Sequence, residues 1–180
     1  MFRKLPRGAL PWINGLVSVG SLLLCTQLLL LRIPGMTILG FSPQWLLMWV
    51  IAWSVKREMI YALLGAIAAA WIHDSLMVSA LPSHLPGFVL VAYFVSRWRQ
   101  QRYLQEDFII LALLVFVMTL AAEVIMAFQY LLWGLGSPGM LWGELQRIGL
   151  ATAILSSLWA PLLCTPLVRW WDYVRMLDRQ

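Results

Sequence analysis

The chain has 180 residues, of which 62% are hydrophobic and only 12% are charged, and its mean hydropathy is +0.80. A soluble domain carries about 25% charged residues, so this sequence lacks the charge to cover a water-facing surface, which excludes a soluble globular enzyme. The net charge of +5 comes from cations that flank apolar segments, so we expect contact with the lipid bilayer and no nucleic acid. The composition predicts an all-α polytopic membrane protein, with residues 1–180 forming a single integral membrane domain.

A helix needs about 20 apolar residues to cross the hydrocarbon layer. The apolar segments predict six transmembrane helices, at about residues 11–33, 38–55, 59–81, 85–98, 108–133 and 142–170. The second and fourth segments have short helix-forming parts. Each is therefore either a full span extended by upstream residues or a re-entrant segment.

The positions of the cations favour six spans over four. With six spans and an internal N-terminus, eleven of the thirteen Lys and Arg residues lie on the cytoplasmic side; with four spans only nine do. This bias predicts that both termini are cytoplasmic. The residues expected to anchor the topology in the two internal loops are Lys56, Arg57, Arg97, Arg99 and Arg102.

Three ionisable residues lie deep in predicted spans, where they are costly unless they have a partner or a function. His73 and Asp74 are in the third span and Glu123 is in the fifth. Asp74 lies about 22 Å from the cytoplasmic end of its span, and Glu123 lies at a similar depth. We expect both carboxylates in the outer half of the membrane, where one outward-opening pocket can hold them.

Small residues accompany these polar groups at helical spacing. Ala66, Ala70 and Asp74 lie one turn apart, Gly65 belongs to the adjoining stripe, and Thr119 precedes Glu123 by one turn in the fifth span. Small residues let a second helix approach closely. We therefore expect this face of the third span to contact protein, and Asp74 to have a hydrogen-bonding partner within the bundle.

The roles left open for these polar residues are a polar lock between helices, a ligand or ion site, and catalysis. No nucleophile–base motif and no metal-binding motif is present. Side chains of adjacent residues such as His73 and Asp74 point about 100° apart on a helix, so they do not readily hold one ion together. We predict no enzyme activity, no catalytic, cofactor or metal site, and a solvated His84 in an external turn.

Several features, in order along the chain, resemble the MreD family of bacterial rod shape-determining membrane proteins. They are Pro43-Gln-Trp45, Trp53 with the basic hairpin after it, Gly65, Asp74-Ser75, the Leu-Pro-Ser-His turn, and the segment from Arg102 to Glu123. The family's Gly and Asp in the third span correspond to Gly65 and Asp74. The family's motif in this span usually reads Gly-Leu before the acidic residue, whereas this chain has Gly-Ala-Ile-Ala-Ala-Ala from Gly65 onward.

The resemblance implies a non-enzymatic six-helix protein of the bacterial cytoplasmic membrane, acting in lateral peptidoglycan synthesis. It implies a direct contact with a bitopic MreC-like protein, and association with a RodA-type glycosyltransferase, a penicillin-binding transpeptidase and MreB. The family's helical core is similar to the substrate-binding subunits of energy-coupling-factor transporters. The alternative function is therefore a small-molecule-binding membrane subunit of a vitamin-type transporter.

Overall fold

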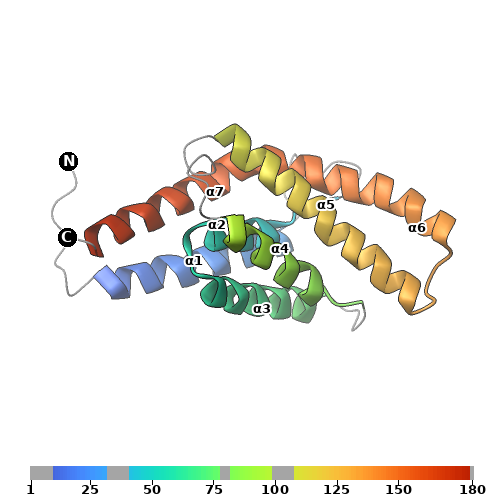
Figure 1. The fold of residues 1–180 in the computed structure, drawn as a ribbon, viewed down its shortest axis with the longest axis horizontal. Coiled ribbons are helices and arrows are strands. Elements are labelled where there is room, and N and C mark those ends of the chain that lie inside the picture. Colours follow the sequence, from blue (N-terminus) through green and yellow to red (C-terminus); the bar gives the residue numbers. More distant parts are fainter. Residues whose placement is uncertain (1–9, 32–40, 78–81, 99–107, 179–180) are drawn as a thin grey trace.

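The computed structural model describes residues 10–31, 41–77, 82–98 and 108–178, and every regular element in these ranges is a helix (Figure 1). The elements in chain order are α1 (Leu10–Leu30), α2 (Trp45–Lys56), α3 (Met59–Leu76), α4 (Leu85–Trp98), α5 (Phe108–Leu132), α6 (Pro138–Glu144), the π-helical segment η3 (Leu145–Gly149) and α7 (Leu150–Asp178). The all-α prediction is therefore confirmed.

Four helical segments are long and apolar enough to cross a membrane. They are Pro11–Leu30, Met59–Leu76, Phe108–Leu132 and the continuous run Pro138–Leu177, which joins α6, η3 and α7. The predicted last span at 142–170 thus lies inside a longer helix. The helices α2 and α4 are apolar but have only 12 and 14 residues, about 18 and 21 Å of helix.

The short helix α2 forms the centre of the bundle. Every one of its side chains except Trp53 is buried, and it contacts α1, α3, α4 and α7. Its one hydroxyl, on Ser54, donates to the Val50 carbonyl at 2.7 Å, so it can be buried without an unpaired polar group. Apart from Ser54 and the terminal Lys56, α2 is hydrophobic on all sides, and a helix of this kind is stable only when other helices surround it.

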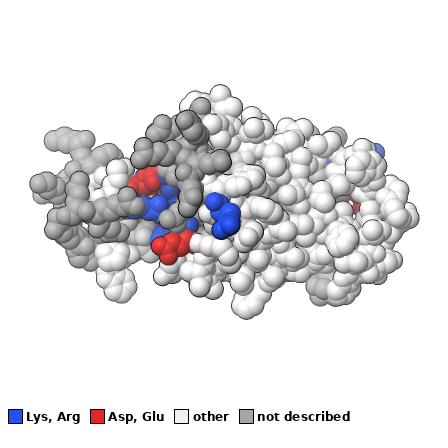
Figure 2. Space-filling model, viewed as in Figure 1, with Lys and Arg blue, Asp and Glu red and all other residues white. Residues whose placement is uncertain are grey.

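The remaining helices pack around α2 in two groups. The α3–α4 hairpin packs against it, while α5 lies alongside α7 on the opposite side of the bundle (Figure 1). The start of α1 and the end of α7 lie at the same end of the molecule, and Trp171 Nε1 of α7 donates to Ser18 Oγ of α1 at 3.3 Å. On the face seen in Figure 2, charged side chains gather toward this end and most of the remaining described surface is uncharged.

Candidate functional site

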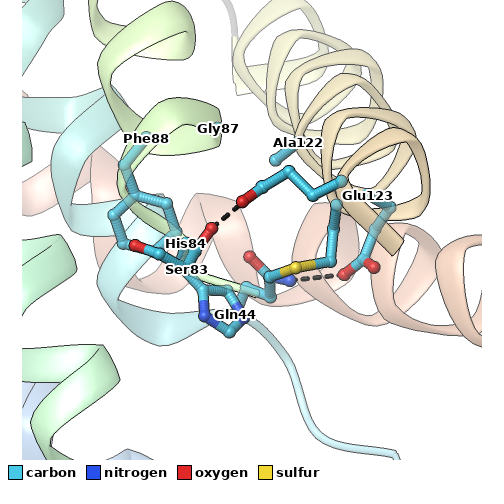
Figure 3. A pocket seen from close by; sticks show the side chains of 9 residues that line it. Gln44, Ser83, His84, Gly87, Phe88, Ala122 and Glu123 are labelled. Atoms are coloured by element: carbon cyan, nitrogen blue, oxygen red, sulfur yellow. Dashed lines mark hydrogen bonds between the residues drawn. The ribbon is translucent and has the colours of Figure 1, made fainter. Parts of the chain in front are cut away.

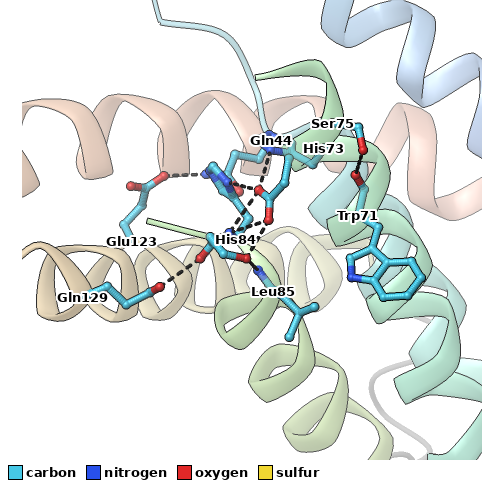
Figure 4. Close-up of polar contacts among 10 residues, drawn as sticks. Gln44, Trp71, His73, Ser75, His84, Leu85, Glu123 and Gln129 are labelled. Atoms are coloured by element: carbon cyan, nitrogen blue, oxygen red, sulfur yellow. Dashed lines mark hydrogen bonds and ion pairs between the residues drawn. The ribbon is translucent and has the colours of Figure 1, made fainter. Parts of the chain in front are cut away.

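The end of α3 is tied to the start of α4 by a polar group that we call the turn cluster, made of His73, Asp74, Ser83 and His84. Figure 4 shows its two histidines beside Gln44. The Asp74 carboxylate accepts hydrogen bonds from the Ser83 hydroxyl at 2.6 Å, from the His84 backbone N–H at 3.1 Å and from His84 Nδ1 at 2.8 Å. The expected hydrogen-bonding partner of Asp74 is therefore confirmed, and it comes from the turn before α4.

The local sequence explains why this turn accepts a carboxylate. The first N–H groups of a helix lack intrahelical partners and carry the positive end of the helix dipole, so a negative charge is favourable there. Asp74 lies against this end of α4, and the Ser83 hydroxyl also accepts a hydrogen bond from the Leu85 N–H at 3.1 Å. Asp74 and Ser83 thus cap α4 together.

His73 is buried, with only 6% of its side chain exposed. Its ring lies against the ring of His84, with 3.9 Å between the centroids, and against Phe88. Its Nδ1 is 3.9 Å from Asp74 Oδ1, too far for a hydrogen bond, and has no hydrogen-bond partner among the described residues. The turn cluster therefore contains one nitrogen whose hydrogen-bonding capacity is unused.

The expectation that His84 is a solvated loop residue is wrong. Its side chain is only 23% exposed and both its backbone N–H and its Nδ1 contact Asp74, because the α3–α4 hairpin brings residues ten positions apart into contact. Burial lowers the pKa of the His84 imidazole below its ordinary value, although the hydrogen bond and the charge of Asp74 act in the opposite direction.

Glu123 of α5 belongs to a second polar group beside the turn cluster (Figure 3). The Gln44 side-chain amide donates to Glu123, and the Gln44 backbone N–H donates to Ser156 Oγ of α7 at 3.0 Å. Gln129, further along α5, donates through Nε2 to the Ser83 carbonyl at 2.9 Å. These bonds link α5 to the turn before α4, and the start of α2 to α5 and α7.

The cavity between these groups has a volume of about 10 Å³ and is lined by Gln44, Ser83, His84, Glu123 and Gln129, among others. Such a volume holds about one water molecule. Glu123 lines this cavity but Asp74 does not. Asp74 is connected to the cavity through His84, which lines it and contacts the Asp74 carboxylate. Thr119 is fully buried one turn before Glu123, and its hydroxyl has no hydrogen-bond partner within the described ranges.

The small-residue face of α3 is confirmed as a contact between helices. Ala62, Ala66, Ala69 and Ala70 are all fully buried. A Cβ atom on Gly65 would lie 2.6 Å from Trp53 Nε1, and this Nε1 donates to the Tyr61 carbonyl at 2.9 Å. Gly65 is therefore the position where the indole of α2 approaches the backbone of α3.

Trp53 is held in place by a group that we call the tryptophan cluster, made of Trp49, Trp53, Arg57 and Trp171. The ring of Trp53 stacks on Trp49, with 5.1 Å between the centroids, and meets the edge of Trp171 at 5.2 Å. The Arg57 guanidinium lies 4.3 Å above its centroid, a cation–π contact. Three helices and the α2–α3 hairpin therefore meet at this indole.

The predicted topology anchors differ in environment. Lys56, expected in an internal loop, is the last residue of α2; it is 1% exposed and forms an ion pair with Asp172 of α7 at 2.5 Å. The reason is that α2 ends inside the bundle, where α7 supplies the opposite charge. Arg97 is exposed in the last turn of α4, and Arg99 and Arg102 lie outside the described residues.

A family model described as rod shape-determining protein MreD matches residues 9–172. The chain belongs to the MreD family. No curated protein and no solved structure matches it.

Membership identifies the chain as a non-enzymatic, multi-pass membrane protein that determines rod shape. Catalysis is therefore excluded as a role for the turn cluster and Glu123. A polar lock between helices and a ligand or ion site remain. In this MreD-family chain the resemblance singles out Gly65, in the first half of α3, and Asp74, in its last turn, and the two make different contacts.

Sequence reasoning missed several residues of these groups, namely Gln44, Ser83, Gln129, Ser156 and Asp172. The predicted site rests on ionisable residues within the predicted spans, whereas most of these residues are uncharged. Gln129 in the apolar α5 was a signal that could have been used, because an amide at membrane depth also needs a partner. Asp172 lay beyond the predicted end of the last span, so nothing linked it to Lys56.

Proposed function

We propose that this MreD-family protein is a membrane scaffold of the cell-wall elongation machinery, which binds an MreC-like bitopic partner and helps maintain rod shape and lateral peptidoglycan synthesis. The observation that carries the proposal is the family match over residues 9–172. Within that machinery, a RodA-type glycosyltransferase, a penicillin-binding transpeptidase and MreB are further proposed associates.

We further propose six crossings of the bacterial cytoplasmic membrane by one integral domain, with both termini in the cytoplasm. An even number of crossings returns the chain to the side where it started, which is supported by the shared position of the start of α1 and the end of α7. The positive-inside bias of Lys and Arg supports the cytoplasmic assignment.

An apolar groove between α1, α2 and α7 is the proposed docking site for the partner's membrane helix. The groove has a volume of about 360 Å³ and is lined almost entirely by apolar side chains, including Leu24, Cys25, Trp45, Trp159 and Leu162. The α1 span is the least enclosed of the four long ones, with 11% of its residues buried against 44% in the run that contains α7. One further helix can pack here by van der Waals contact, which drives association in lipid.

The scaffold accounts for the site better than a vitamin-type transport subunit does. The polar cavity beside Glu123 and His84 has room for about one water molecule, so it does not fit a vitamin. The similarity to energy-coupling-factor subunits is therefore a proposal about helix arrangement only.

Co-expression with the MreC-like protein of the same cell, followed by purification in detergent through a tag on one protein, tests the scaffold. We expect the two proteins to copurify at equal stoichiometry. Two well-folded proteins that separate under these conditions contradict the proposal.

A matched pair of variants tests the groove. Leu23 and Leu24 are adjacent on α1 and similarly exposed, at 56% and 55%, but only Leu24 lines the groove. We expect Leu24→Trp to fill the groove and reduce copurification, while Leu23→Trp leaves it unchanged. Equal recovery of the partner with both variants places the docking site elsewhere.

A further inference from the structure

We propose that the turn cluster binds a divalent transition-metal ion of the zinc type through His73, Asp74 and His84. The site goes beyond the scaffold function and departs from our expectation that the chain has no metal site. It is independent of partner binding, so either proposal can fail alone.

The donor atoms of the three side chains converge. One nitrogen of each imidazole and one oxygen of Asp74 all lie within 4.8 Å of one another. The chain has only two histidines, and both meet at this carboxylate although they come from α3 and from the turn before α4. Two ligands of a tetrahedral zinc ion lie about 3.4 Å apart, given Zn–N and Zn–O distances of about 2.1 Å. The separations of 2.8 and 3.9 Å from Asp74 Oδ1 to the two Nδ1 atoms bracket that value.

One ring nitrogen of His73 is buried without a hydrogen-bond partner. Its Nδ1 has no hydrogen-bond partner in the described part of the chain, and its side chain is 94% buried (6% exposed) beside Asp74 and His84. A hydrogen-bonded lock would leave this buried atom unsatisfied, which has a free-energy cost. A metal ion between the three side chains gives it a partner. This atom therefore distinguishes a metal site from a simple lock between α3 and α4.

The Asp74 carboxylate is already oriented by hydrogen bonds from the turn before α4. The Ser83 hydroxyl and the His84 backbone N–H both donate to Asp74, leaving the carboxylate directed at the two rings. Metal-binding residues are commonly held by such hydrogen bonds, which fix their orientation. Gln129 in turn holds the Ser83 carbonyl, so the turn itself is fixed from α5.

The donor set indicates the class of ion. Two neutral imidazoles and one carboxylate suit zinc and related divalent ions, with a water molecule in the fourth position. On binding, the His84 ring keeps its single proton by carrying it on Nε2 in place of Nδ1, and Asp74 binds as the carboxylate, so no other reactant is needed. The ion would join the end of α3 to the start of α4.

The test uses the full chain purified in detergent with a tag that contains no histidine, stripped with a chelator and dialysed against Zn²⁺. We expect one Zn²⁺ per chain, and a visible spectrum of tetrahedral type when Co²⁺ replaces it. His73→Ala and His84→Ala should each weaken Zn²⁺ binding about tenfold or more. Glu123→Gln is the matched control, because it alters the neighbouring polar group and no ligand, and it should bind Zn²⁺ as the unaltered chain does.

A second measurement needs no variant, in case a histidine substitution prevents folding. Diethyl pyrocarbonate modifies accessible imidazoles, and mass spectrometry locates the modification. We expect Zn²⁺ to protect both histidines. The proposal is overturned if the unaltered chain binds no Zn²⁺, if both histidine variants bind it as well as the control, or if Zn²⁺ leaves the modification unchanged.

Discussion

The polar groups at the two ends of α3 are assembled from different parts of the chain. Just before its start, Lys56 pairs with Asp172, which follows 116 residues later, and Trp53 meets Trp171 of the same distant helix. Near its end, the hydrogen-bond partners of Asp74 among the described residues, Ser83 and His84, lie within the next ten positions, in the turn that leads into α4. One end is therefore built by long-range packing and the other by a local hairpin.

This difference separates two uses of polar groups in a membrane protein. The Lys56–Asp172 pair ties α7 to the end of α2, since a buried charge that loses its counter-charge is costly. The turn cluster fixes the geometry of three potential ligands, mainly through contacts within the α3–α4 hairpin. Changes at the first end should affect assembly of the bundle, and changes at the second should affect the local site.

The largest effect is expected from breaking the ion pair. Asp172→Asn leaves the Lys56 ammonium buried without a counter-charge, and should lower the free energy of unfolding by about 3 kcal/mol. Tryptophan fluorescence during chemical unfolding in detergent measures this. The double variant Lys56→Met, Asp172→Asn removes both charges and should recover most of the loss. A double variant as unstable as the single one would contradict the role of the pair.

A smaller effect is expected at the other end of α3. Asp74→Leu removes the acceptor of the Ser83 and His84 hydrogen bonds and should cost about 2 kcal/mol. We expect it to be less well tolerated than Cys25→Ala, which removes only a buried thiol. Expression level, partner binding and restoration of rod shape compare the two variants. Equal behaviour in all three would refute the prediction.

The approach of Trp53 to α3 gives a third test. Gly65→Ala places a methyl group within contact of an indole that stacking and a hydrogen bond hold in place, and should cost about 1 to 2 kcal/mol. Gly15→Ala is the matched control, because nothing lies within 4 Å of the added atom. It should leave stability unchanged or raise it slightly in a thermal unfolding assay. If Gly65→Ala is as harmless as the control, the indole is free to move.

The smallest effect is expected at the link between α5 and the turn. Gln129→Leu removes the hydrogen bond to the Ser83 carbonyl and should cost about 1 kcal/mol. The same measurement on Ser157→Ala, whose hydroxyl donates only within α7, provides the control. A loss no greater than the control's would show that α5 does not support the turn cluster.

The sequence predicted the helical class, the four long spans and the small-residue face of α3, because each is a local consequence of apolar length and spacing. It also identified Asp74, His73 and Glu123 as polar groups deep in the predicted spans that require partners. The partners themselves were not predicted. Gln44 and Gln129 are uncharged residues near the ends of helices, and pattern reasoning gave them no role.

The features that the sequence alone determined come from residues close together in the chain, and those that only the tertiary structure decided come from contacts between helices. Hydropathy and helical periodicity are properties of neighbouring residues, so the apolar segments and the scarcity of charge determined that this chain is a helical membrane protein. The burial of α2 on all sides, the pairing of Lys56 with Asp172 and the meeting of both histidines at Asp74 depend on how helices pack. Only the tertiary structure decided these, because the positions of charges along the chain do not specify which of them lie together in space.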